Sequence, residues 1–286
     1  MTNQNTLRDR ALAFRALHVP GRPLVLPNAW DAASARIVED AGASAVATTS
    51  AGLAWALGVP DGDRLDRERA LEALARITAT VAVPVSADIE SGFAKDAAGV
   101  ADTVRAVLAA GAVGVNIEDA LYGAEIDDAA YGGEGVLRPV AEQAERIAAA
   151  REAADAEGVP LFVNARIDTY LRGVGGVDAT LERAAAFRAA GADGIFVPGA
   201  VEPGTVKELA DGIDAPLNVL VGPGAPPVAE LAALGVARVS AGSGIALAAY
   251  AVVRRAAREL LDTGTYGAQT GGLGYGELNS LLGQGR

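Results

Sequence analysis

Carboxylate side chains stand close to the ends of short apolar runs in this sequence. Asp88 and Glu90 close one such run, Glu118 closes the next, and Asp61 follows an earlier one. An extended chain points residues two apart to the same side, so Asp88 and Glu90 should face one way. Like charges held close together repel, and a divalent cation between them removes that conflict. The pattern therefore predicts a metal site.

The residue types restrict which metal this site would bind. The chain has no cysteine and one histidine, His18, so oxygen atoms must provide the ligands. Oxygen ligands favour Mg²⁺ or Mn²⁺ over zinc. The same counts exclude disulfides and a thiolate nucleophile, and we expect a structural or surface role for His18. A second interpretation stays open: Asp61, Glu90 and Asp119 are also typical of helix caps and turns.

Arg166 ends another apolar run and needs an anionic partner, because an unpaired buried charge is very costly. That partner is either a substrate carboxylate, held by two hydrogen bonds, or a protein carboxylate such as Asp168 or Glu118. The residues alone favour neither alternative.

Small residues follow the second apolar run, at Thr49, Ser50 and Ala51. Small side chains let backbone N–H groups approach an anion closely. The alternative for this segment is a tight turn with no ligand.

The elements that would position these groups alternate along the chain. Apolar runs typical of buried parallel strands occupy 24–27, 45–49, 83–88, 114–118, 161–166, 194–197, 217–221 and 238–240. Helices are expected at 32–41, 65–80, 97–110, 140–157, 179–190, 204–210, 228–234 and 242–262. Gly42, Gly111, Gly191 and Gly235 each close a helix shortly before a strand, where glycine provides the left-handed cap.

This repeated unit predicts an α/β fold, a (β/α)8 TIM-type barrel that spans 1–286 as a single domain. A doubly wound open sheet is the alternative. The Gly-rich tail 263–286 contains no expected element. In such barrels the catalytic loops follow the C-terminal ends of the strands, which is where the carboxylates lie.

Composition narrows the function classes. The net charge is −12, and no basic patch is present to neutralise phosphates, so a nucleic-acid partner is not expected. No apolar run approaches the about 18 residues of a membrane helix, and the first ten residues lack the apolar core of a signal peptide. We therefore expect a cytoplasmic protein without a membrane partner.

At these residues the sequence resembles the isocitrate lyase / phosphoenolpyruvate mutase superfamily over nearly its whole length. The resemblance rests on the order of six segments, namely LPNAWDAASA (26–35), TSAG (49–52), GVPD (58–61), DIESGF (88–93), NIED (116–119) and NAR (164–166). It implies a barrel whose last helix is exchanged between paired subunits in a dimer or tetramer. It also implies Mg²⁺ as cofactor and a small 2-oxo acid as ligand.

The resemblance implies a role for each matching residue. Asp88 matches the direct Mg²⁺ ligand, and Asp61, Glu90 and Glu118 match the carboxylates that hold the water shell of the metal. Thr49, Ser50 and Ala51 match the segment that binds the carboxylate and oxo group of the substrate. Arg166 matches the substrate-contacting arginine, and Asp61, Arg166 and Glu118 are the candidate catalytic residues. The distal group of the substrate would face Trp55, Tyr122 or Asn218.

One stretch departs from the family pattern. Lyase members carry a cysteine-containing loop after strand four, whereas 120–137 here has no Cys, Lys, His, Ser, Thr or Asn. Isocitrate and methylisocitrate lyase activities are therefore not expected. Mutase and hydrolase members also use polar groups on this loop. Tyr122, Tyr131 and Glu134 remain candidate proton donors.

Four functions remain to be compared. A Mg²⁺-dependent lyase that cleaves or decarboxylates a 2-oxo or dicarboxylic acid needs an electron sink but no cysteine, which fits this chain. Alternatives are a 2-oxo acid binding protein with little catalysis, and a phosphonopyruvate or phosphoenolpyruvate type mutase or hydrolase. A sugar-phosphate enzyme is the fourth, because Gly-rich loops at 221–224 and 240–244 follow the last two strands.

Overall fold

The core of the molecule is a single parallel sheet. The computed structural model describes residues 2–122 and 137–283, with side chains from residue 6 onward. All strand pairs are parallel, and the sheet order is β1-β9-β8-β7-β6-β5-β4-β3-β2. The strands are β1 (Leu24–Leu26), β2 (Asn28–Ala29), β3 (Val46–Thr48), β4 (Val85–Asp88), β5 (Gly114–Glu118), β6 (Phe162–Arg166), β7 (Gly194–Val197), β8 (Leu217–Leu220) and β9 (Arg238–Ser240).

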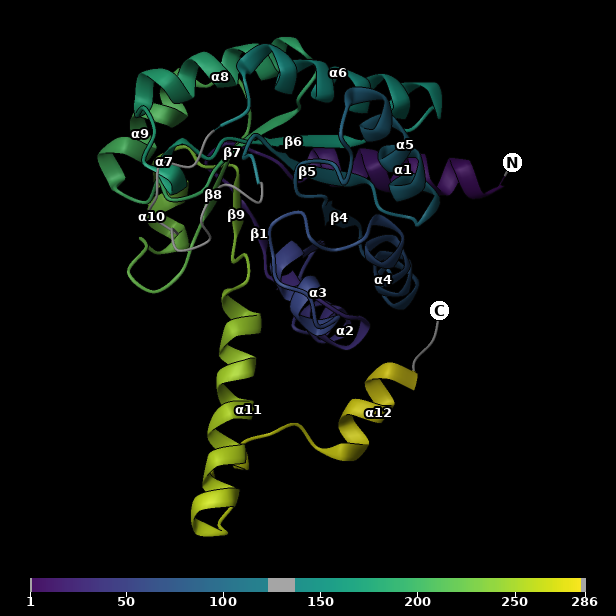
Figure 1. Cartoon of the computed structure of the whole chain (residues 1–286), viewed down its shortest axis with the longest axis vertical. Helices are drawn as coiled ribbons and strands as arrows, with labels where there is room; N and C mark the ends of the chain where they lie inside the picture. The colour runs from purple at the N-terminus through teal and green to yellow at the C-terminus, as the bar shows by residue number, and fades with distance from the viewer. Residues whose placement is uncertain (1, 123–136, 284–286) are drawn as a thin grey trace.

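Pro27 explains why nine strands make an eight-stranded barrel. It alone separates β1 from β2, and proline has no N–H to contribute to a strand ladder. β1 pairs with β9 and β2 pairs with β3, so both ends of the sheet order belong to one stretch of chain. The ring closes there, and the predicted (β/α)8 barrel is confirmed (Figure 1).

Helices surround the sheet (Figure 1). They are α1 (Thr2–Ala16), α2 (Ala32–Asp40), α3 (Ser50–Ala56), α4 (Arg67–Thr80), α5 (Ala97–Ala109), α6 (Val140–Ala156), α7 (Thr169–Arg172), α8 (Val177–Ala189), α9 (Pro203–Gly212), α10 (Val228–Ala233), α11 (Gly244–Thr263), the 3₁₀ turn η1 (Gly267–Gln269) and α12 (Tyr275–Gly283). Each of the eight predicted helices is present within two residues of its expected ends. The four predicted glycine caps all have positive φ, between 95° and 104°. In the described part of the chain, no helix has both the length and the apolar character to cross a bilayer.

The tail was predicted to contain no element, and this is wrong for its described part. Glu259, near the end of α11, accepts backbone hydrogen bonds from Gly267 and Ala268, both at 2.7 Å, and this folds the chain back into η1. α12 then returns to the barrel, where Arg36 Nε on α2 donates to Leu281 O at 3.2 Å. Polar contacts with residues elsewhere in the chain thus order this segment, although its Gly-rich composition does not indicate a helix.

Helix α1 closes the N-terminal end of the barrel and was also not predicted. Its buried side chains Ala11, Phe14 and the following His18 recur at intervals of three and four residues, which is the pattern of one helix face. Phe14 lies against Gly114, the first residue of β5. The His18 ring stacks on Phe162, the first residue of β6, with centroids 3.8 Å apart. The expected structural role of His18 is confirmed.

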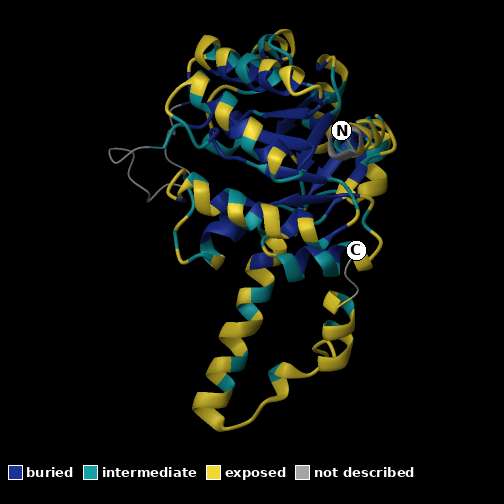
Figure 2. Ribbon diagram, turned by 90° about the vertical axis from the view of Figure 1, so that its right-hand side faces the viewer, coloured by how far each residue is buried: buried dark blue, intermediate teal, exposed yellow. Residues whose placement is uncertain are grey.

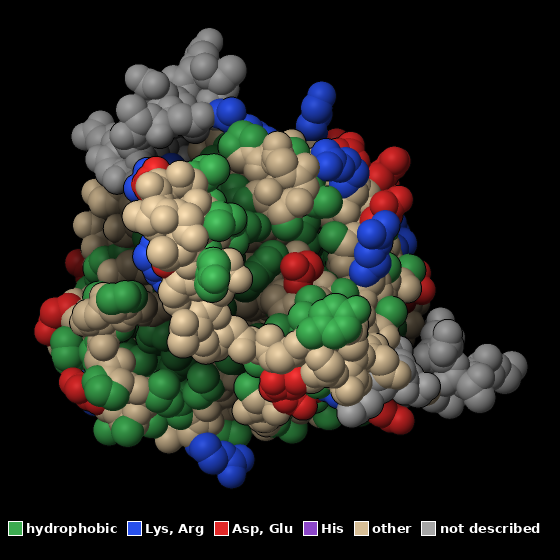
Figure 3. Space-filling view, turned by 90° about the horizontal axis from the view of Figure 1, so that it is seen from below, with side chains coloured by type: hydrophobic (Ala, Val, Ile, Leu, Met, Phe, Trp, Pro, Cys, Tyr) green, Lys and Arg blue, Asp and Glu red, His purple; other side chains and the backbone are tan. Residues whose placement is uncertain are grey.

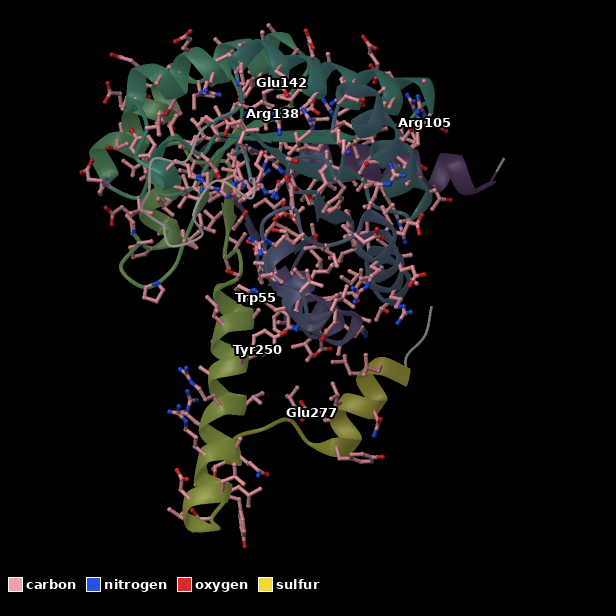
Figure 4. All side chains as sticks on the ribbon, in the orientation of Figure 1. Trp55, Arg105, Arg138, Glu142, Tyr250 and Glu277 are labelled. Carbon is pink, nitrogen blue, oxygen red and sulfur yellow. The ribbon has the colours of Figure 1, made fainter. Side chains whose placement is uncertain are left out.

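Helix α11 leaves the barrel as an isolated rod (Figures 1 and 2). Its first turns contact the barrel: Tyr250 packs edge-on against Trp55 of α3, with centroids 6.3 Å apart (Figure 4). Beyond that contact its apolar side chains are exposed, with Val253 at 64% and Leu261 at 84%.

The buried histidine predicts a pH effect on stability. Burial, and then the charge of Arg238, lower the pKa of His18 from 6.5 to about 3. Between these two values the unfolded chain binds a proton that the folded chain does not, so stability should fall progressively as pH drops from 6.5 towards 3. Because the chain has one imidazole, its NMR signals can be assigned without ambiguity.

We expect the His18 signals of the folded protein to stay constant from pH 8 to about 4. The variant His18→Phe should show a smaller loss of free energy of unfolding over the same range. A titration midpoint near 6.5 in the folded protein would show that His18 is not held neutral by its surroundings.

Candidate functional site

Three neighbouring strands end in charged side chains at the same end of the barrel. Asp88 is the last residue of β4, Glu118 of β5 and Arg166 of β6. The strand register pairs Asp88 with Asn116, and Glu118 with Arg166. This is the C-terminal end of the barrel, where the sequence predicts the site.

Asp88 is held by the junction that follows β3. The Ser50 N–H donates to Asp88 Oδ2 at 3.3 Å, and the Asp88 N–H donates to Thr48 Oγ1 at 2.8 Å. Thr49 caps α3 by accepting from the Gly52 N–H. The predicted segment of small residues is therefore the start of a short helix, and it lies beside the proposed metal ligand.

Glu90 reaches the site by a different route from the one expected. The extended chain ends at Asp88, and Glu90 has a φ of 50°, in the left-handed region that non-glycine residues seldom adopt. Its carboxylate accepts the Asp63 N–H, while Asp63 Oδ1 accepts the Ser91 N–H at 3.3 Å. The expectation that spacing alone would align Asp88 and Glu90 is wrong, because a turn separates them.

Asp63 is a site residue that the sequence analysis missed. Like Glu90, it has a positive φ, of 55°, and Phe93 in the same region has a φ of 50°. Strained backbone of this kind concentrates at functional sites. The reciprocal bonds between Asp63 and the Glu90–Ser91 turn join two loops, and neither the type nor the spacing of these residues signals such a pairing.

The four predicted carboxylates, which we call the carboxylate site (Asp61, Asp88, Glu90 and Glu118), interact electrostatically. Burial raises the pKa of Glu90 to about 8, and the charges of Asp63, Asp61 and Asp88 contribute to that rise. Burial and then the charge of Asp88 raise the pKa of Asp61. Glu118 is 2% exposed, and burial raises its pKa well above the ordinary value, with Asp88 adding to the effect. The barrel therefore brings these groups together at a cost in charge repulsion.

Arg166 has both of the protein partners considered from the sequence. Its Nε and Nη2 donate to Asp168 at 2.6 and 2.9 Å, and its Nη1 forms an ion pair with Glu118. A guanidinium carries five N–H groups, so one on each terminal nitrogen remains for a ligand. The structural pairing thus fixes the orientation of Arg166 without using all its donors.

The carboxylate site fits an ion that keeps its water shell. Among the described residues, no three acidic or imidazole side chains converge closely enough to coordinate one ion directly. Mg²⁺ usually binds one or two carboxylates and keeps several waters. Within the described part of the chain, Asp61 Oδ1 and Glu118 Oε1 are buried without a hydrogen-bond partner, and water held by a cation would supply the missing donors.

Other predicted residues lie in different places. Tyr122 lies over Gly62 and near Glu118, whose charge, after burial, raises the pKa of the tyrosine. Trp55 packs on Tyr250 of α11. Asn218 is buried in the barrel, where its Oδ1 accepts from Ser240 Oγ at 3.1 Å. The predictions for Tyr131 and Glu134 fall outside the described residues.

The structure bears on two alternatives from the sequence, the role of Asp119 and the sugar-phosphate hypothesis. Asp119 binds the Asp168 N–H at 2.9 Å and Arg183 at 3.0 Å, so it holds a turn, as one interpretation predicted. The loop after β9 offers little to a phosphate, because the N–H groups of Ala241 and Gly242 already donate to Asn28 Oδ1 at 3.0 and 2.8 Å. This loop therefore gives the sugar-phosphate hypothesis no support.

A basic residue of α6 supports the site from outside the barrel, and the sequence analysis missed it. Arg146 is 2% exposed, and its Nη1 donates to Ser91 O at 3.0 Å and to Ala94 O at 3.1 Å. Its Nη2 donates to Lys95 O. These bonds hold the loop that contains the strained Glu90. An arginine in the middle of an Ala-rich helix gives no sequence signal for such a contact.

Comparisons with known proteins agree with this geometry. The family model described as phosphoenolpyruvate phosphomutase matches residues 14–261. The uncharacterized protein Rv1998c of Mycobacterium tuberculosis is 40% identical over 253 residues, covering 88% of this chain and 90% of that protein. The 2-methylisocitrate lyase of Escherichia coli is 31% identical over 214 residues, covering 74% and 70%.

A solved structure of phosphonopyruvate hydrolase with oxalate and Mg²⁺ is also similar. Its TM-score is 0.80 at 28% sequence identity, and the match covers 96% of this chain and 95% of that one. Family model, relatives and fold agree along most of the chain. The chain belongs to the phosphoenolpyruvate phosphomutase family, within the isocitrate lyase / phosphoenolpyruvate mutase superfamily.

Proposed function

We propose that the chain is a Mg²⁺-dependent lyase that cleaves a carbon–carbon bond of a small 2-oxo acid or related dicarboxylic acid, or decarboxylates it. The superfamily contains such lyases together with mutases and hydrolases. The observation that supports the proposal most directly is the carboxylate site, where repelling groups lie beside buried oxygen atoms to which no described residue donates a hydrogen bond. A divalent cation resolves both features at once.

Each residue has a role in this proposal. Asp88 would hold Mg²⁺ directly, and Asp61, Glu90 and Glu118 would hold its waters. When bound, the metal supplies electrophilic stabilisation of negative charge on the oxo oxygen of the substrate. The backbone of Thr49, Ser50 and Ala51, beside Asp88, would bind the substrate carboxylate and oxo group. The free N–H groups of Arg166 would orient the substrate, and Asn218 remains a candidate for its distal group.

Loss of carbon dioxide, or of a carbonyl fragment, from the carbon next to the oxo group suits these residues. The protein must then stabilise negative charge and exclude water, and it needs neither a nucleophile nor a cysteine. The sequence of residues 120–137 contains no cysteine, which fits that requirement. Tyr122 lies near Glu118 and remains a candidate proton donor.

The first test removes the proposed metal ligand. Asp88→Asn should lower kcat/KM for the best substrate by more than about a hundredfold, because loss of a direct ligand exceeds the effect of losing an outer contact. Turnover should be measured on a panel of 2-oxo and 2-hydroxy dicarboxylic acids, with Mg²⁺ and with a chelator, and products should be identified. Asp102→Asn, an exposed position on α5, is the matched control.

Wild-type turnover by Asp88→Asn would refute the assignment. Tight binding of oxaloacetate or pyruvate by the wild-type protein, with no product at high enzyme concentration, would favour a binding protein instead. Release of phosphate from phosphonopyruvate would favour a hydrolase.

We also propose that α11 is exchanged with a second copy of the chain in a homodimer or tetramer. Two observations support this. Along α11, apolar side chains such as Leu247 and Val253 are exposed, at 53% and 64%. On the barrel, Val25 of β1 is 44% exposed, whereas its outward neighbour Val239 of β9 is 1% exposed. None of the helices in residues 2–122 and 137–283 covers β1 at this position.

The uncovered position is a groove with apolar walls. It runs along β1 between α2 and the chain that follows α1, and Leu17, Val25, Pro27 and Val38 line it. On the side to which α11 projects, the space-filling view shows hydrophobic side chains in hollows of the molecular surface (Figure 3). An apolar helix from a partner would cover this groove, while α11 covers the corresponding groove of the partner.

The oligomer can be tested by charge insertion. Leu247→Glu and Val253→Glu should convert the wild-type oligomer to a monomer in light-scattering chromatography, because each would bury a charge without a partner. Leu12→Glu, at an exposed apolar position on α1, should leave the mass unchanged. A wild-type protein that is monomeric at micromolar concentration would contradict the proposed exchange.

A further inference from the structure

Arg238 of β9 crosses the interior of the barrel. In the closed strand order, β9 and β5 lie on opposite sides of the ring. Nevertheless Arg238 Nη2 donates to Asn116 Oδ1 of β5 at 3.2 Å. Asn116 is the register partner of Asp88. The guanidinium therefore lies inside the barrel, below the carboxylate site.

This arginine has no ion-pair partner among the described residues. It is 1% exposed, and its Nε and Nη1 have no hydrogen-bond partner there. Burial lowers its pKa to about 9, which still leaves it charged at neutral pH, and the charge of Asp88 opposes that lowering. The positive charge of Arg238 also lowers the pKa of His18 and so helps to keep that ring neutral.

Stability does not explain a cation in this position. A buried charge without a paired carboxylate destabilises the fold, and an apolar side chain of similar volume is often neutral or better. The rest of this interior layer consists of neutral groups: Asn116 bonds Asn164 Nδ2 at 2.8 Å, and Asn218 is the register partner of Arg238. Among the described residues, the carboxylate whose charge opposes the lowered pKa of Arg238 is Asp88, the proposed metal ligand.

We propose that Arg238 is a positioning residue that balances the charge of the site through Asp88 and Asn116, weakening Mg²⁺ binding and strengthening the binding of the anionic substrate. This inference rests on the proposed function. In a low-dielectric interior a single charge acts over several ångströms with little screening. It repels a divalent cation and attracts both a substrate carboxylate and the negative charge that develops on the oxo oxygen.

The opposite signs of these two effects make the test specific. Oxalate, a dianion that resembles the carboxylate and oxo group of the substrate, serves as the probe. Isothermal titration calorimetry measures first Mg²⁺ alone and then oxalate on Mg²⁺-saturated protein. For Arg238→Met we expect Mg²⁺ to bind several-fold more tightly and oxalate about tenfold more weakly, on the scale of one unit charge at an intermediate dielectric.

Three further variants separate charge from packing. Arg238→Lys keeps the charge and should restore both affinities towards wild type. Asn116→Asp places a neutralising charge beside Arg238 and should shift both affinities in the same directions as Arg238→Met. It therefore serves as the test if Arg238→Met does not fold. Arg105→Met removes an arginine from the exposed surface of α5, far from the site (Figure 4), and should change neither affinity.

The outcomes distinguish this inference from the proposed function. A wild-type protein that binds neither Mg²⁺ nor oxalate overturns both. If the wild type binds them but Arg238→Met weakens both, or changes neither, then Arg238 is only a structural residue and the charge-balancing role is wrong. Only opposite shifts, reversed by Arg238→Lys, support the inference.

Discussion

Repulsion among carboxylates at the C-terminal end of the barrel is the constraint on which the rest of the structure depends. Asp88 and Glu118 are fixed at the ends of adjacent parallel strands, so the backbone ladder itself holds them close. Burial makes the charged form of Glu118 costly, and the charge of Asp88 helps to raise the pKa of Asp61, Glu90 and Glu118. Such an arrangement is stable only with compensating positive charge.

The protein provides part of that compensation itself. Arg166 pairs with Asp168 and Glu118 at the mouth of the barrel, and Arg238 lies beneath Asp88 in the interior. The remaining negative charge is what a divalent cation would neutralise. The interior of this barrel is correspondingly polar, with one pair of polar side chains from β5 and β6 and another from β8 and β9. A purely structural barrel would be filled by branched apolar side chains there.

The two ends of the barrel are closed in different ways. At the N-terminal end α1 closes the barrel with an aromatic cluster, and His18 is part of it as a neutral ring. At the C-terminal end, loops with left-handed Asp63, Glu90 and Phe93 bring polar groups inward, and Arg146 holds one of these loops through three carbonyl groups. Packing secures the first end, whereas hydrogen bonds to strained backbone secure the second.

The sequence by itself determined the order of strands and helices, because continuous apolar runs and helix-closing glycines are local signals that reflect burial in a parallel sheet. It also placed Asp88, Glu118 and Arg166 at strand ends, because each closes an apolar run. Parallel strands end at one edge of the sheet, so these side chains had to lie near one another. It missed α1 and α12. The face of α1 carries only a few apolar residues, and α12 is ordered by contacts with residues far away in the chain, such as Arg36.

Only the tertiary structure decided how the site is completed. The turn that presents Glu90, its bond to Asp63, and the position of Arg238 below Asp88 depend on residues far apart in sequence. The physical reason is that strand ends are set by local periodicity, which a sequence displays. Contacts across the barrel are set by closure of the ring, which the sequence alone does not reveal.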